Sequence, residues 1–267
     1  MPGIPADPAI AATDSRPLDV ALPIASQSAI APLSELPSAQ KSTWLRVAYE
    51  RGEVEIPPIH SLAEFRAWAL SDDFPASGRI DYLDGCLEVD MSPEDAGDHN
   101  QPKTEVSRAF ATLAKATRLA RVYIDRMLVT HPGANLSTEP DVMVVTREAF
   151  ASGRIRAVPR ANNPEKSAEF EGSPDLVVEI VSDSSVAKDR RRLPALYFAA
   201  GVRELWLVDA RGESLAFQIF ARGESDWQET APDSEGYLRS LVFDRRFRFD
   251  RTRAEDGEWD YDLSVRE

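Results

Sequence analysis

A glutamate in the middle of an apolar run is the feature that most restricts what this chain can fold into. Glu179 lies within GSPDLVVEIVSDSS (residues 172–185), among the aliphatic and mostly β-branched residues 176–181. An apolar run bounded by turn-forming residues is typical of an interior strand with both faces covered, as in an α/β sheet. A carboxylate there must be paired, protonated or bound to a metal, because an uncompensated buried charge costs several kcal/mol.

A second strand of the same kind begins after Glu139-Pro140-Asp141, where the sequence continues VMVVT. Because side chains alternate along a strand, Asp141 shares a face with Glu139. If the two strands are neighbours, Asp141 and Glu179 converge in a poorly solvated place. Mg²⁺ or Mn²⁺ is the usual way to keep two such carboxylates ionised. The alternative is that these acids belong to structural ion pairs.

Composition limits the classes of partner and compartment. The net charge of −14 argues against a broad nucleic-acid-coating surface but leaves room for a local basic groove. A single cysteine, Cys86, excludes an intrachain disulfide and indicates a cytoplasmic protein. The sequence contains no apolar run long enough for a membrane helix and no secretory signal pattern, so we expect no membrane association. The composition of the chain is also compatible with a homodimer.

The chain divides into a tail and one domain. Residues 1–42 are rich in Pro, Ala and Ser, and no aromatic residue precedes Trp44. Such a segment buries too little surface to offset the entropy of ordering it, so we expect a disordered tail. Residues 43–267 are long enough for a single α/β domain.

The expected elements within that domain alternate between strands and helices. Ser61 and Glu64 form a capping box at the start of a helix, and Asp84-Gly85 favours a hairpin turn. The order predicts a mixed sheet flanked by helices. The main predicted segments are a helix over 62–71, strands over 79–83 and 86–91, a helix over 101–118, a strand over 122–129, a helix over 147–151, a polar loop to 173, a helix from about 190 to 200, and strands over 203–209 and 214–222.

Four segments, RIDYLDG, EPDVMVV, GSPDLVVEIVSDSS and YFAAGVRELWLVD, occur in an order that resembles the Uma-type restriction endonucleases, the Uma-two family. That family is a branch of the PD-(D/E)XK nuclease superfamily, and the resemblance covers roughly residues 60–215. It implies a restriction-endonuclease-like fold and Mg²⁺-dependent hydrolysis of DNA phosphodiester bonds. It also implies that Asp141 and Glu179 bind the metal, with the main-chain carbonyl of Ile180 completing the metal's ligands.

The sequence departs from the family pattern at two positions. Asp81 stands where the family usually has a glutamate, and we expect it to serve as an accessory catalytic and metal-binding acid. Leu193 occupies the position that usually carries the catalytic lysine, so Lys188 or Arg192 must supply the cation. We favour Lys188 as the catalytic group and Arg192 as a substrate contact. His99 lies where the family often has a histidine, and we assign it to substrate binding.

Two functions therefore compete. The first is a metal-dependent DNA endonuclease, and the second is a catalytically degenerate nuclease-fold protein that acts as a nucleic-acid-binding or regulatory module. The two differ in whether Lys188 or Arg192 points at the carboxylates. The segment RRFRFDRTR (residues 245–253) alternates basic and aromatic residues, which favours a charge-protected edge strand over a nucleic-acid contact.

Overall fold

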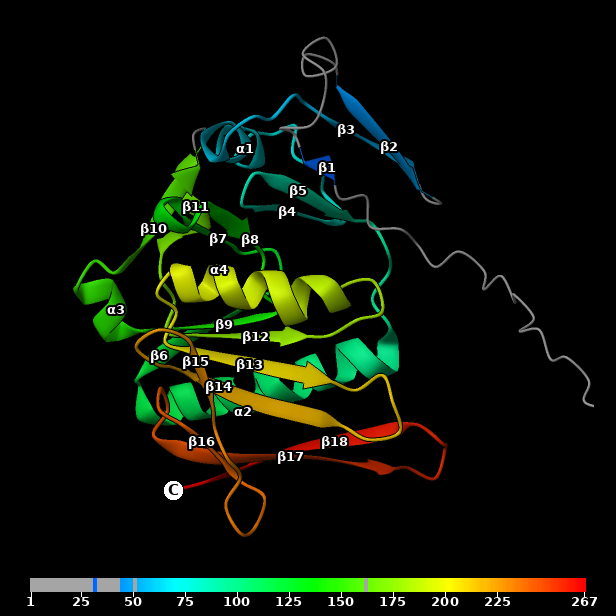
Figure 1. Cartoon of the computed structure of the whole chain (residues 1–267), viewed down its shortest axis with the longest axis vertical. Helices are drawn as coiled ribbons and strands as arrows, with labels where there is room; N and C mark the ends of the chain where they lie inside the picture. Colours follow the sequence, from blue (N-terminus) through cyan, green and yellow to red (C-terminus); the bar gives the residue numbers. More distant parts are fainter. Residues whose placement is uncertain (1–30, 33–43, 50–51, 161–162) are drawn as a thin grey trace, which may run out of the picture.

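The computed structural model describes residues 31–32, 44–49, 52–160 and 163–267, and two large mixed sheets dominate it (Figure 1). The seven-stranded sheet has the spatial order β1 (Ala31–Pro32), β5 (Cys86–Asp90), β4 (Arg79–Leu83), β8 (Leu136–Thr138), β7 (Leu128–His131), β11 (Asn163–Gly172), β10 (Ile155–Arg160). The six-stranded sheet has the order β15 (Trp227–Glu229), β14 (Ala216–Arg222), β13 (Glu204–Asp209), β12 (Leu176–Ile180), β9 (Val142–Thr146), β6 (Ala120–Ile124).

Smaller elements complete the α/β architecture. Two further sheets are formed by β2 (Leu45–Tyr49) with β3 (Gly52–Ile56), and by β16 (Leu238–Ser240), β17 (Arg245–Arg253) and β18 (Trp259–Arg266). The helices are α1 (Leu62–Ala69), α2 (Gln101–Thr117), α3 (Arg147–Ala151) and α4 (Leu193–Ala199). Single helical turns are η2 (Ala96–Asn100), η3 (Pro132–Ala134) and η4 (Lys188–Arg192).

The six-stranded sheet is covered on both faces, as its apolar strands predict. On one face Val144 and Val178 pack against Phe110 of α2 and Phe247 of β17, and all four are fully buried. On the other face α4 runs beside β12 (Figure 1). There Leu193 and Tyr197 of α4 form one buried apolar cluster with Val177 of β12. Burial of both faces removes several hundred Å² of apolar surface from water, which is the main stabilising contribution of this sheet.

The chain changes sheets between β8 and β9. Thr138 ends a strand of the seven-stranded sheet, and Val142 begins a strand of the six-stranded sheet. The connecting residues Glu139, Pro140 and Asp141 are therefore placed between the two sheets, and each is buried. This crossover brings Asp141, at the start of the six-stranded sheet, next to β4 of the seven-stranded sheet.

Several predicted elements are confirmed. Ser61 accepts a hydrogen bond from the Glu64 amide at 3.2 Å, so the capping residue of α1 is as predicted. Asp84 and Gly85 both have positive φ, as a tight hairpin between β4 and β5 requires. Gly201, with φ of 82°, follows the end of α4.

Three predicted segments are wrong. The segment expected as an edge strand, residues 245–253, is β17, the central strand of its sheet between β16 and β18. The strand expected over 122–129 is broken at Asp125 and Arg126, which have φ of 43° and 51°, and its halves β6 and β7 join different sheets. The polar loop expected before Ser173 is the β10–β11 hairpin. That hairpin is mostly exposed, so it lacks the apolar alternation that signals a strand.

The predicted tail, residues 1–42, lies outside the described residues except for Ala31–Pro32. Those two residues form β1, which pairs with Leu87 and Cys86 at the edge of the seven-stranded sheet. The boundary of the domain at residue 43 stays a prediction.

Candidate active site

Asp141 and Glu179 meet where β9 and β12 lie side by side. The strands are antiparallel neighbours with Val142 opposite Val178, so Asp141, directly before β9, falls on the same side of this pair as Glu179. The Asp141 carboxylate accepts a hydrogen bond from the Ile180 amide at 2.7 Å. Both acids are buried, with 1% and 0% of their surface exposed. The predicted convergence of the two strands is therefore present.

Glu179 lacks a full set of hydrogen-bond partners. Its Oε1 accepts a hydrogen bond from the Tyr197 hydroxyl at 2.5 Å, whereas its Oε2 is buried with no partner among the described residues. Burial, together with the charge of Asp141, raises the pKa of Glu179 well above its ordinary value. The side chain therefore holds a proton unless a cation lies beside it.

Arg79, on β4, is a cation that the sequence did not lead us to expect here. Its guanidinium lies 3.1 Å from Asp141 Oδ1 and donates to the main-chain carbonyl of Glu139. Burial opposes ionisation of Asp141, but Arg79 and His99 hold its pKa well below the ordinary range. Strand alternation could have indicated Arg79 from the sequence, since Arg79 and the predicted acid Asp81 share a face of β4.

Asp81 connects the site to Lys188. Its Oδ2 lies 3.2 Å from the Lys188 ammonium, and its Oδ1 accepts a hydrogen bond from the Glu139 amide at 3.1 Å. Burial and Arg79 disfavour the charged amine, yet attraction to Asp81, Asp189 and Glu179 raises the pKa of Lys188. Lys188 is therefore a buried ammonium that faces the carboxylates.

Arg192 has a different environment. Its guanidinium lies 2.8 Å from Glu88 and 3.3 Å from the carbonyl of Leu83, on the β4–β5 hairpin. Of the two candidate replacements for the missing lysine, Lys188 is the one directed at the predicted acids. Asp189, next to Lys188 in the chain, has a pKa that burial raises to about 6.

His99, on η2, lies between two acids. Its Nε2 is 3.4 Å from Asp141 Oδ2, and its Nδ1 is 3.6 Å from Glu94 Oε2. Burial disfavours the imidazolium, but Asp141 and Glu94 together raise the pKa of His99 to about 9. Within the described part of the chain, Glu94, His99 and Asp141 also offer metal-ligand atoms within 4.8 Å of one another. The sequence suggested His99 and Asp141 but gave no reason to single out Glu94.

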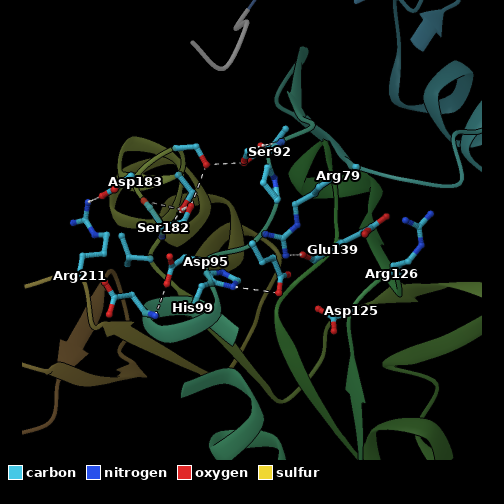
Figure 2. A pocket seen from close by; sticks show the side chains of 18 residues that line it. Arg79, Ser92, Asp95, His99, Asp125, Arg126, Glu139, Ser182, Asp183 and Arg211 are labelled. Carbon is cyan, nitrogen blue, oxygen red and sulfur yellow. Dashed lines mark hydrogen bonds and ion pairs between the residues drawn. The ribbon is translucent and has the colours of Figure 1, made fainter. Parts of the chain in front are cut away.

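A cavity of about 570 Å³ opens beside these residues (Figure 2). Arg79, His99 and Glu139 are part of its wall, whereas Asp81, Asp141, Glu179 and Lys188 are not among its lining residues. Most of its other charged lining residues are acidic: Asp90, Glu94, Asp95, Asp98, Asp125 and Asp183, against Arg126 and Arg211. An acidic cavity favours entry of cations.

The oxygen atoms at this place fit a hard divalent cation. Glu179 Oε2 has no partner among the described residues. Asp141 Oδ1 and the Glu139 carbonyl are occupied by Arg79, which a divalent cation binding there would have to displace. Carboxylate and carbonyl oxygens are the ligands that Mg²⁺ and Mn²⁺ prefer. Ile180 meets Asp141 through its amide. A metal-binding role for the Ile180 carbonyl stays a prediction.

In the part of the chain that the structure describes, no helix is long and apolar enough to cross a membrane.

The solved structures include a similar chain, described as a putative nuclease belonging to DUF820 from Anabaena variabilis ATCC 29413. It is 19% identical, the match covers 62% of the present chain and 83% of that chain, and the TM-score is 0.46. A search of curated proteins gave no match. A family model described as "Uma2: Putative restriction endonuclease" matches residues 62–250, more than half of the sequence. The chain therefore belongs to the Uma2 family of restriction-endonuclease-like proteins.

Proposed function

We propose that this protein is a metal-dependent endonuclease that hydrolyses DNA phosphodiester bonds. The observation that carries the proposal is that Asp141, directly before β9, and Glu179 of β12 flank the paired residues Val142 and Val178. One buried oxygen of Glu179 has no partner in the described part of the chain. Membership of a family described as restriction endonucleases supports a nuclease. Mg²⁺ or Mn²⁺ is the cofactor class that such oxygens favour.

Asp141 and Glu179 would hold the metal, with Asp81 close by and His99 and Glu94 on the cavity side. When bound, the metal would polarise the scissile phosphate and lower the pKa of an attacking water. Tyr197 fixes the orientation of Glu179 through its hydroxyl. Arg79 balances the Asp141 charge in the absence of metal, so a divalent ion at Asp141 must compete with this guanidinium.

Lys188 would supply the cation that the family pattern places near the second acid. Its ammonium is buried and held by Asp81 at 3.2 Å, so its position is fixed before substrate arrives. A preorganised charge in a poorly solvated site stabilises the developing charge of a transition state without the cost of reorientation. Arg192, engaged with Glu88, would affect substrate binding through the position of the β4–β5 hairpin.

A specific observation favours a second function, that of a catalytically degenerate binding or regulatory module. Arg79 already neutralises Asp141, and neither Asp141 nor Glu179 lines the cavity. While Arg79 holds Asp141 Oδ1, that oxygen is not available to a metal. The fold would then serve for binding nucleic acid without cleaving it.

A paired assay separates the two functions. Supercoiled plasmid is incubated with the wild-type protein, Glu179→Gln and the exposed-site control Glu148→Gln, each with Mg²⁺, Mn²⁺ or EDTA. We expect nicking by wild type and Glu148→Gln with metal, and none by Glu179→Gln. In parallel, Mn²⁺ should raise the melting temperature of wild type and Glu148→Gln but not of Glu179→Gln, since a ligand that binds the folded state stabilises it.

The two readouts distinguish the outcomes. Nicking by Glu179→Gln at the wild-type rate would refute the proposed site. Absence of nicking in every metal, with no Mn²⁺-dependent change in melting temperature, would favour the binding module. We further propose a cytoplasmic location, which the single cysteine supports. A homodimer is the assembly to test by light scattering.

A further inference from the structure

An open groove of about 700 Å³ lies at the end of β6 away from the acidic cavity. It is formed where the last turns of α2, the strand β6 and the start of α3 meet. Four basic side chains line it: Lys115, Arg118, Arg121 and Arg147. All four are exposed, and no acidic side chain is among the lining residues.

These four charges are not compensated within the described part of the chain. None of the four forms an ion pair there, although Arg108, on the same helix α2, is paired with Glu105 at 2.5 Å. Arg147 donates to the carbonyl of Arg118 at 2.8 Å, and Arg121 lies 6.0 Å from the ring of Phe150, which leaves their positive charges unmatched. In a protein of net charge −14, such a cluster favours a polyanion.

The groove is connected to the cavity by the edge of one strand. β6 is the last strand of the six-stranded sheet, and no described strand pairs with its outer edge. Arg121 lies in the groove, and Asp125 and Arg126, just beyond the same strand, line the cavity. From Arg121 the strand continues for three residues to Ile124, which corresponds to about 10 Å, and the chain turns at Asp125 and Arg126. That length corresponds to about three nucleotides of one DNA strand, each of which advances about 3.4 Å along the helix axis.

We propose that this groove binds the phosphate backbone of the DNA substrate at least about three nucleotides from the bond in the cavity. The inference rests on the proposed function and adds the surface that positions the substrate. Lys and Arg side chains contact phosphates without regard to sequence, so the groove supplies affinity and register but no base preference. The acidic cavity, in contrast, repels DNA without a metal and needs an anchor outside it.

The test is DNA binding measured without cleavage. A fluorescein-labelled 30-bp duplex is titrated in EDTA with wild type and with the double variant Lys115→Gln/Arg121→Gln, at NaCl concentrations from 50 to 200 mM. Loss of two phosphate contacts should lower the slope of log K against log [salt] by about 1.8. It should weaken binding by up to about 60-fold at 0.1 M salt, the contribution of counterion release from two contacts.

A matched control separates position from net charge. Lys166→Gln/Arg246→Gln removes one lysine and one arginine from exposed positions elsewhere in the chain. We expect this variant to bind DNA within about threefold of wild type. Equal weakening in both double variants would overturn the groove assignment, because net charge alone would then explain the effect.

Two further outcomes are decisive. A groove variant that binds DNA like wild type, with the wild-type salt slope, would refute the inference while leaving the nuclease proposal intact. Failure of wild type to bind any DNA at 50 mM NaCl would also refute it, and the nicking assay judges the nuclease proposal independently. The Mn²⁺-dependent rise in melting temperature should be the same in the groove variant and wild type, which shows that the fold and the metal site are unchanged.

Discussion

Replacing Glu139 by glutamine should stabilise the protein at alkaline pH and have little effect at acid pH. Glu139 is 5% exposed and lies in the crossover between the two large sheets. Burial raises its pKa to about 7, with a further contribution from Asp81. Glutamine has nearly the same shape and cannot ionise, so the variant removes the charge without creating a cavity.

The magnitude follows from the difference between the folded and unfolded pKa values. In the unfolded chain Glu139 titrates near 4.5, and in the folded protein near 7. Below pH 4.5 the group is protonated in both states and contributes nothing. Between pH 4.5 and 7 the folded state holds a proton that the unfolded state releases, so stability falls by about 1.4 kcal/mol per pH unit. Above pH 7 the full loss is about 3 kcal/mol.

Urea unfolding followed by tryptophan fluorescence in EDTA measures this difference. We expect the unfolding free energy of Glu139→Gln to exceed that of wild type by about 3 kcal/mol more at pH 8 than at pH 4.5. Glu255→Gln, at an exposed position, controls for the loss of one negative charge. Parallel pH profiles for wild type and Glu139→Gln would refute the reasoning, because burial at the crossover would then impose no penalty on the carboxylate.

Three further predictions concern the cation of the site, the protonation of His99 and the N-terminal segment. Lys188→Ala should lower the cleavage rate at least ~100-fold, the scale of losing one preorganised donor, whereas Arg192→Ala should chiefly weaken substrate binding. Initial rates and KM distinguish the two effects. The reverse result would make Arg192 the catalytic cation and Lys188 the substrate-binding residue. The proton of His99 should titrate near pH 9 by NMR, and the stability it contributes should be complete below pH 6.5 and lost as pH rises through about 9; a midpoint near 6.5 would contradict its pairing with Asp141. Deleting residues 1–42 should leave the melting temperature within a few degrees by calorimetry, and a larger loss would mean that the segment packs on the domain.

Local sequence patterns determined the strands that carry the two central acids. The run VMVVT and the run LVVEI form β9 and β12 at the predicted places, because short and mostly β-branched apolar runs favour a strand that is covered on both faces. The position of Glu179 inside such a run was sufficient to identify a buried carboxylate that needs a partner. Alternation then predicted which acids share a face. These features depend on neighbours in the chain, so the sequence contains them.

The partners of those acids depended on the tertiary structure. Arg79 reaches Asp141 from the other large sheet, and Glu94 reaches His99 from a loop, so neither contact has a signal in local sequence. The β10–β11 hairpin likewise forms because β11 pairs with β7, although its own residues are mostly exposed and polar. Long-range pairing decides such elements, since their stability comes from a partner strand and not from their own apolar pattern.

The sequence by itself thus determined the α/β class, the two acidic strands and the choice of Lys188 over Arg192 as the cation to test. Only the tertiary structure divided the strands between two sheets and placed Arg79 on Asp141. It also brought the basic residues of α2, β6 and α3 into one groove. The physical reason is that hydrophobic periodicity specifies which face of an element is buried, whereas the approach of two charged side chains depends on how separate elements pack together.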